Sequence, residues 1–323
     1  MTAQQTGEIN VIFILGYTRS GSTLLENLLS MAPGSVAVGE IAYLWEQSVR
    51  NNGFCGCGSK LVHCPFWHNV LQAQPRQDFE QGRSPNVQPF WSFFTDLIRR
   101  GRPFNSHDYK SFLSQIQSVY RAINDQTGGK MIIDSSKRPV FGLAVSRIRG
   151  VNVTFIHLVR DSRGCAFSWK RAKARMELGK NRFMSRRPAY RSALAWVVNN
   201  LQAEILRTGR CRNIFLRYED LVANPTFEVN KILDQVSLPS ISSDQNGIFH
   251  APISHGIGGN PDRWSSMNRI TITPDQRWVT ELSAVDYAVT TLISAPLLIR
   301  YRYPFAKSRR PSSIGIGANA NGR

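Results

Sequence analysis

An apolar run that passes through a glycine-bounded turn directly into a helix is the feature that most constrains this chain. The run covers residues 11–15, the turn holds Gly16 and Gly21, and leucines at helical spacing follow over 23–29. A buried strand, a tight turn and a helix N-terminus together form a nest of backbone N–H groups that favours an anion. The sequence therefore predicts an anion-binding site at the end of a strand near the N-terminus.

The turn has the glycine spacing of the phosphate-binding loop G-x-x-x-x-G-K-[ST], but Ser22 stands in the place of the lysine. Enzymes that use nucleoside triphosphates place that lysine on the β and γ phosphates. The only cation in this loop is Arg19, three positions earlier. This departure favours a ligand other than a triphosphate.

Four further segments have the composition of strands, and helical patterns separate them. The predicted strands are 35–38, 130–134, 153–159 and 213–218, and apolar residues recur at helical spacing around 90–98 and 109–123, from about 162, and over 188–207. This alternation predicts an α/β fold, a P-loop-like three-layer domain whose central parallel sheet of about five strands is flanked by helices. We expect one domain over 1–303, with a Cys-rich and helical insertion at about 41–130.

Charge is distributed unevenly along the 323 residues. The net charge is +18, and residues 137–191 hold fifteen Lys and Arg against two acidic residues. Such a block suits a polyanionic partner: a phosphorylated nucleotide, an acidic glycan, an anionic membrane or a nucleic acid. A solubilising basic face would give the same composition.

The sequence predicts neither a signal peptide nor a transmembrane helix. No stretch of eighteen apolar residues occurs, and residues 1–10 lack a basic start and a hydrophobic segment, so we expect a cytoplasmic protein. Residues 304–323 are basic, without acidic residues or apolar periodicity, and are predicted to be disordered. The apolar segment before them, 287–299, fits a final packed helix or a peripheral contact with a membrane through this basic end.

The loop resembles that of sulfotransferases that use 3′-phosphoadenosine-5′-phosphosulfate (PAPS). Those enzymes carry Lys or Arg at the position of Arg19, followed by Ser-Gly-[ST]-[ST]. The resemblance implies that the loop binds the 5′-phosphosulfate, and the residues it assigns to this role are Thr18, Arg19, Ser20, Gly21, Ser22 and Thr23.

A second segment pairs Arg160, at the end of a predicted strand, with Ser168 in the helix that follows. A forked guanidinium and a hydroxyl at this spacing can converge on one phosphate. The segment resembles the Arg-Asp-Pro-Arg…Ser segment of the same family, which holds the 3′-phosphate of PAPS, with Ser162 replacing the proline. Arg163 can contact the ligand or lie as an ordinary residue at a helix N-terminus.

Two more segments resemble the family. Tyr218, within the run Arg-Tyr-Glu-Asp-Leu, corresponds to a tyrosine near the adenine, although a strand end with Asp220 as a helix cap would read the same. The stretch Gly259-Asn260-Pro-Asp-Arg263 resembles the Gly-Asn-Pro-x-Arg loop of bacterial sulfotransferases, which implies a loop that closes over the nucleotide.

The catalytic residues implied by the resemblance are Glu40, Arg19 and Lys137. A glutamate after glycine is the proposed base in the tyrosylprotein and several bacterial sulfotransferases, and a base is needed because the acceptor loses a proton. Lys137 matches a lysine after the third strand of the tyrosylprotein branch and is assigned to the transferring sulfonate. Arg19 and the loop amides would stabilise charge on the leaving oxygen. The implied reaction needs no metal.

A cysteine-rich insertion has three possible roles. Cys55, Cys57 and Cys64, with His63 or His68, could bind zinc, although Cys-x-Cys is tighter than the usual spacing. A local disulfide and plain reduced thiols are the alternatives. An odd total of five cysteines argues against a full disulfide framework.

Taken together, the motifs over about 11–265 predict transfer of a sulfonate from PAPS to a hydroxyl or amine, releasing adenosine 3′,5′-bisphosphate. The acceptor class stays open among small molecules, glycans and lipids, as does the oligomeric state. A P-loop kinase that uses ATP is the alternative, disfavoured by Ser22. A nucleic-acid-binding protein is a weaker one, since no recognisable motif accompanies the basic block, and we expect no nucleic-acid partner.

Overall fold

The computed structural model describes residues 8–46, 53–74, 107–171, 186–258 and 269–306. The expected helix at 90–98, the tail from 307 onward, and the residues Gly259, Asn260 and Arg263 lie outside these ranges.

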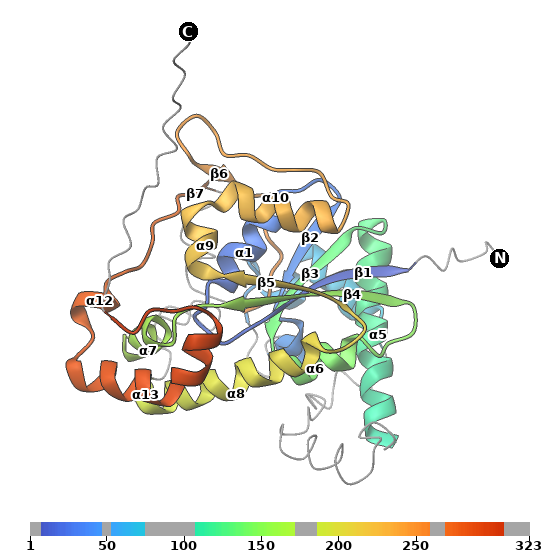
Figure 1. Ribbon diagram of the computed structural model, residues 1–323. Coiled ribbons are helices and arrows are strands. Elements are labelled where there is room, and N and C mark those ends of the chain that lie inside the picture. Colours follow the sequence, from blue (N-terminus) through green and yellow to red (C-terminus); the bar gives the residue numbers. More distant parts are fainter. Residues whose placement is uncertain (1–7, 47–52, 75–106, 172–185, 259–268, 307–323) are drawn as a thin grey trace, which may run out of the picture.

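Five parallel strands form the central sheet, which confirms the predicted α/β fold (Figure 1). The strands are β1 (Ile9–Leu15), β2 (Ser35–Gly39), β3 (Met131–Lys137), β4 (Val151–Val159) and β5 (Arg212–Arg217), in the order β2-β3-β1-β4-β5. The central strand β1 is buried along nearly its whole length because helices cover both faces of the sheet.

The alternating side chains of β1 face two separate core clusters. Ile12 and Ile14 pack with residues of α1 (Ser22–Leu29), α9 (Tyr218–Ala223) and α10 (Pro225–Gln235). Val11 and Phe13 pack with residues of α2 (Pro65–Gln72), α5 (His107–Thr127) and α6 (Pro139–Val145) on the other face. The cysteine-rich insertion thus contributes α2 to the main core, with η3 (Leu61–His63) just before it.

A third cluster of helices lies at the carboxyl end of β4. It contains α7 (Ser162–Lys170), α8 (Ala189–Arg207), α12 (Trp278–Glu281) and α13 (Ala284–Arg300). The hydroxyls of Ser294 in α13 and Ser162 in α7 are 2.7 Å apart and buried. Residues 284–300 therefore form a final packed helix, one of the two forms expected for this segment. No helix in the described part of the chain is long and apolar enough to cross a bilayer.

Candidate active site

The loop after β1 depends on two glycines. Gly21 is the N-cap of α1 and has φ 90°, and a Cβ added there would lie 2.5 Å from Cδ2 of Tyr218. A Cβ on Gly16 would lie 2.2 Å from the carbonyl oxygen of Leu158. Only glycine fits at either position, because the backbone of the loop is pressed against β4 and α9. The loop therefore forms a tight turn, as its glycine spacing predicts.

The N-terminus of α1 opens onto this turn. Its first intrahelical bond runs from Leu25 N–H to the oxygen of Gly21, at 3.0 Å, so the amides before Leu25 precede the helical hydrogen-bonding pattern. The buried Oγ1 of Thr18 has no hydrogen-bond partner among the described residues. Amides that precede the helical pattern and a hydroxyl without a partner, all around one turn, fit a phosphate-like group.

Arg19 is held in an uncommon backbone conformation within the loop. Its φ is 74°, in the left-handed region, and its guanidinium carbon lies 5.3 Å from the ring centroid of Trp169. Lys137 shares this property, with φ 63°. Left-handed backbone at non-glycine residues costs free energy and tends to occur at functional sites. Two of the three predicted catalytic residues carry this strain.

Glu40 and Lys137 meet beside the loop. Lys137 ends β3 and pairs in register with Leu15, the residue just before Gly16. Its Nζ donates to Oε1 of Glu40 at 2.5 Å and to the carbonyl oxygen of Ser135 at 3.1 Å. The exposed fractions of the two side chains are 8% and 12%, so the ion pair is largely withdrawn from water.

The backbone around Glu40 is fixed by three elements. The amide of Gly39 donates to Oε1 of the buried Glu26 at 2.8 Å, and the amide of Glu40 donates to the oxygen of Ile257 at 2.8 Å. The second oxygen of Glu26 accepts from the hydroxyl of Ser135 at 2.7 Å. Glu26 was missed in the sequence because it lies inside the leucine pattern of α1 and belongs to no motif.

Asp134 forms a second buried polar group under the site. Its carboxylate accepts from the hydroxyls of Tyr120 and Ser136, each at 2.5 Å, and from the amide of Ser136 at 2.7 Å. Ser136 Oγ in turn accepts from the amide of Ala42, in η1 (Ile41–Tyr43), at 3.0 Å. Burial raises the pKa of Asp134 to about 7, with the neighbouring Glu26 adding to the rise. This group anchors the segment that follows Glu40.

Arg160 connects the loop to the C-terminal part of the chain. Its guanidinium donates to the oxygen of Arg19 at 3.2 Å and to the oxygen and carboxylate of Asp275 at 3.1 and 3.4 Å. The same group lies 4.5 Å from the ring centroid of Tyr218, whose ring packs against Gly21. The structure thus brings Arg160 and Tyr218 to the loop, while Ser168 lies buried near the end of α7. Asp275 belongs to none of the sequence motifs.

Arg163 and Asp220, whose roles the sequence left open, both lie in paired positions. Arg163 is fully buried, forms a forked ion pair with Asp161 at 2.8 and 2.6 Å, and donates to the oxygen of Pro304 at 2.7 Å. It fastens the C-terminal segment to α7 and is not the surface residue that its position at a helix N-terminus suggested. Asp220 lies in the first turn of α9, whose N-cap is Arg217, so it is not the helix cap that its position suggested.

The segment that carries the predicted glycine loop begins next to Glu40. Gly258 has φ 63°, and a Cβ added there would lie 3.6 Å from the carboxyl carbon of Glu40. The predicted roles of Gly259, Asn260 and Arg263 stay predictions, because those residues lie outside the described part of the chain.

These features define an α/β protein that can hold a phosphorylated ligand at the carboxyl edge of a parallel sheet. Residues 11–242 match the model of the sulfotransferase family, so the chain belongs to that family and is a transferase of sulfonate groups. No curated protein matches the sequence.

Solved structures support the same fold. The sulfotransferase domain from the Synechococcus PCC 7002 olefin synthase is 18% identical, with a TM-score of 0.51, and the similarity covers 94% of this chain and 98% of that one. The sulfotransferase domain from the curacin biosynthetic pathway is 19% identical, with a TM-score of 0.55, over 92% and 99%. At these identities the likeness establishes the fold alone.

Proposed function

We propose that the protein transfers a sulfonate from PAPS to a hydroxyl or amine of an acceptor, with Glu40 as general base. The observation that carries this proposal is the position of Glu40 and Lys137 beside the glycine-bounded loop. Lys137 pairs in register with the residue that precedes the loop, and its side chain donates a hydrogen bond to the carboxylate of Glu40. A cation for the sulfonate and a base for the acceptor therefore stand together where a 5′-phosphosulfate would end.

The donor would be held at two places. The amides at the start of α1, the hydroxyl of Thr18 and the side chain of Arg19 would bind the 5′-phosphosulfate. Arg160, supported by Ser168, would bind the 3′-phosphate, and Tyr218 would lie near the adenine. The guanidinium of Arg160 also bonds to Asp275, so a phosphate bound there would share it with that carboxylate.

The transfer itself is an in-line displacement at sulfur. The acceptor oxygen or nitrogen forms a bond to sulfur while the bond from sulfur to the bridging oxygen of the 5′-phosphate breaks. The acceptor proton passes to the carboxylate of Glu40. The negative charge that appears on the bridging oxygen is stabilised by Arg19 and the loop amides, and Lys137 holds the sulfonate oxygens. Adenosine 3′,5′-bisphosphate leaves as the second product.

The acceptor is proposed only as a class: a small molecule, glycan or lipid that carries a hydroxyl or amine. The basic block does not by itself indicate a nucleic acid, since several of its members are paired. Lys137 pairs with Glu40, Arg160 with Asp275, and Arg163 with Asp161.

Two measurements test the proposal. The unfolding temperature should rise with adenosine 3′,5′-bisphosphate and should not change with ATP–Mg²⁺. A ligand at 100 times its Kd stabilises the folded protein by about 2.7 kcal/mol, which is enough to measure. Incubation with ³⁵S-labelled PAPS across phenols, glycans and lipids should label an acceptor. Stabilisation by ATP–Mg²⁺ alone would instead indicate a kinase and overturn the proposal.

A further inference from the structure

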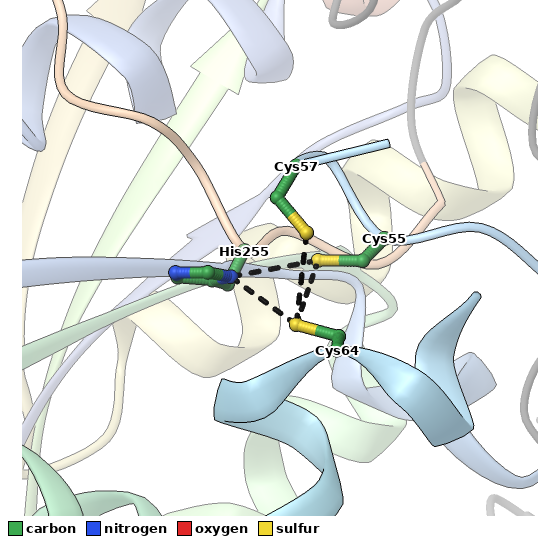
Figure 2. A group of neighbouring side chains, drawn as sticks. All are labelled: Cys55, Cys57, Cys64 and His255. Atoms are coloured by element: carbon green, nitrogen blue, oxygen red, sulfur yellow. Dashed lines mark hydrogen bonds between the residues drawn. The ribbon is translucent and has the colours of Figure 1, made fainter. Parts of the chain in front are cut away.

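Three cysteines and a histidine converge at the junction between the insertion and the segment that leads to residue 258. Cys55, Cys57, Cys64 and His255 place one sulfur or ring nitrogen each within 4.8 Å of all the others. Figure 2 shows the four side chains pointing toward one another, with Cys55 and Cys57 on one loop, Cys64 at the start of a helix and His255 on a separate segment. The sequence offered His63 or His68 as the fourth member, but the structure brings in His255, about 190 residues further along the chain.

The spacing of these atoms fits a tetrahedral metal. The sulfur of Cys64 lies 3.6 Å from that of Cys55 and 3.7 Å from that of Cys57. The Nδ1 atom of His255 lies 3.3 Å from the sulfur of Cys64 and 3.7 Å from that of Cys55. Zinc with bonds of about 2.3 Å to sulfur and about 2.0 Å to nitrogen requires about 3.8 Å between sulfurs and about 3.5 Å between sulfur and nitrogen. A Cys₃His set is a recurrent ligand set for structural zinc.

The ligands are held by backbone bonds that do not involve the metal. Cys55 N–H donates to the oxygen of Ser59 at 2.8 Å, and Cys64 N–H donates to the oxygen of Lys60 at 2.8 Å. Cys64 is also the N-cap of α2, so its position is fixed by the start of that helix. The histidine ring stacks on Phe66, with centroids 4.9 Å apart and planes 6° apart. Contacts other than metal bonds therefore also hold the four side chains in position.

We propose that Cys55, Cys57, Cys64 and His255 bind one structural Zn²⁺ ion. Binding displaces the thiol protons and involves no change of oxidation state. All four positions are filled by protein atoms, so no coordination site is left for a substrate or a water nucleophile. The ion is separate from the sulfonate-transfer chemistry and does not depend on the donor proposed above.

The metal would join the insertion to the backbone that supports Glu40. Gly56 N–H donates to the oxygen of Gly256 at 3.0 Å, and Trp67 Nε1 donates to the oxygen of His255 at 2.6 Å. Ile257, two residues after His255, forms backbone bonds on both sides of Gly39, to Val38 O at 3.0 Å and from Glu40 N at 2.8 Å. Zinc would thus fix the segment that precedes the predicted nucleotide loop.

The experiment is a metal and thiol count on the intact protein. Protein purified under anaerobic conditions without added thiol reductant and loaded with Zn²⁺ should retain one zinc per chain by mass spectrometry after gel filtration. All five cysteines should react as free thiols once the protein is unfolded with a chelator present. Replacement of zinc by Co²⁺ should give the intense thiolate-to-cobalt absorption and visible bands of a tetrahedral site.

Substitution of single residues tests which side chains bind the zinc. Cys57→Ser and His255→Asn should lower zinc retention at least tenfold and weaken the cobalt bands, and the matched controls Cys211→Ser and His68→Asn should keep one zinc. No retained metal in the wild-type protein, a different metal in preference to added zinc, or two thiols missing from the count because of a disulfide would each overturn the proposal. The wild-type measurements decide the matter even where a variant fails to fold.

Discussion

The ammonium of Lys137 donates a hydrogen bond to the carboxylate of Glu40 over 2.5 Å, although the two residues are 97 positions apart, Lys137 ending β3 and Glu40 following β2. They meet because β2 and β3 are neighbours in the sheet and both end at the carboxyl edge. The pair is nearly buried, and each charge is the principal compensation for the other. Any change to one member therefore acts on the stability of the protein as well as on its chemistry.

Glu40→Gln separates proton transfer from binding. The amide oxygen still accepts from Lys137, but it cannot take a proton from the acceptor, so kcat should fall about 10²–10⁴-fold. Affinity for adenosine 3′,5′-bisphosphate, measured by calorimetry, should change less than about threefold because Glu40 is not assigned to the nucleotide. The exposed Glu281→Gln in α12 serves as the control. Full turnover by Glu40→Gln would remove it from the role of base.

The fold was predictable because each strand contains a short run rich in apolar residues, and these runs alternate with helical patterns. All five strands lie at the expected positions, with ends shifted by at most three residues, as β3 shows by continuing to Lys137. The extension to Lys137 could not be read from the sequence. Ser135 and Ser136 are polar, and they are buried in the strand only because Glu26 and Asp134 bond to them.

The site was predictable only where a motif spans a few residues. The turn at Gly16 and Gly21, and the arginine at the end of β4, depend on local spacing that a sequence displays. Asp275 and His255 reach their partners from more than 100 residues away through tertiary packing. Asp275 sits in no motif, and nothing in the glycine-rich stretch around His255 links that residue to the cysteines, so the structure was needed to find both partners.

Arg160→Ala should weaken binding of adenosine 3′,5′-bisphosphate by about 10- to 100-fold, since hydrogen bonds to charged groups contribute roughly 1.5–3 kcal/mol. Arg160→Lys should recover only part of this loss, because lysine lacks the planar fork that lies over Tyr218. Calorimetric titration measures both. Arg277→Ala is the matched control: its guanidinium also bonds to Asp275, but it is exposed. Equal losses of affinity in the Arg160 and Arg277 variants would mean that the nucleotide responds to the net charge of the protein and not to a contact with Arg160.

Gly21→Ala should destabilise the protein more than Gly150→Ala. Both glycines have left-handed backbone, with φ of 90° and 79°, so both substitutions carry a conformational cost of about 1–2 kcal/mol. A Cβ at Gly150 meets nothing within 4 Å, whereas one at Gly21 collides with the ring of Tyr218. Urea unfolding gives the free energy of unfolding of both variants. The additional loss of stability in Gly21→Ala measures the collision with the ring of Tyr218. Similar losses would mean that the loop can move away from Tyr218.

Asp134→Asn should change how stability depends on pH. Burial raises the pKa of Asp134 to about 7, so the folded state binds a proton that the unfolded state has released, and this group's contribution to stability falls as pH rises from about 4 to about 7. Burial lowers the pKa of His157 to about 4, so the contribution of that group to stability changes with pH in the opposite direction. The quantity to follow is therefore the difference in free energy of unfolding between the variant and the wild type. Asparagine mimics the protonated acid. The variant should therefore gain stability relative to wild type between pH 5 and pH 8 in urea unfolding, and a constant difference would contradict the raised pKa.

Lys137→Met tests both roles of the ion pair. The variant keeps an apolar stem but leaves the nearly buried carboxylate of Glu40 without its cation, which should cost on the order of 3 kcal/mol in the free energy of unfolding. Turnover should fall about 10²–10³-fold because the sulfonate loses a charged donor. Adding Glu40→Gln to Lys137→Met removes the stranded charge, so the double variant should recover much of the stability while remaining inactive. Urea unfolding and the labelled-donor assay measure the two quantities separately. If the double variant is no more stable than Lys137→Met, the two residues do not compensate each other in the folded protein, and the cation would be tied to Ser135 rather than to the base.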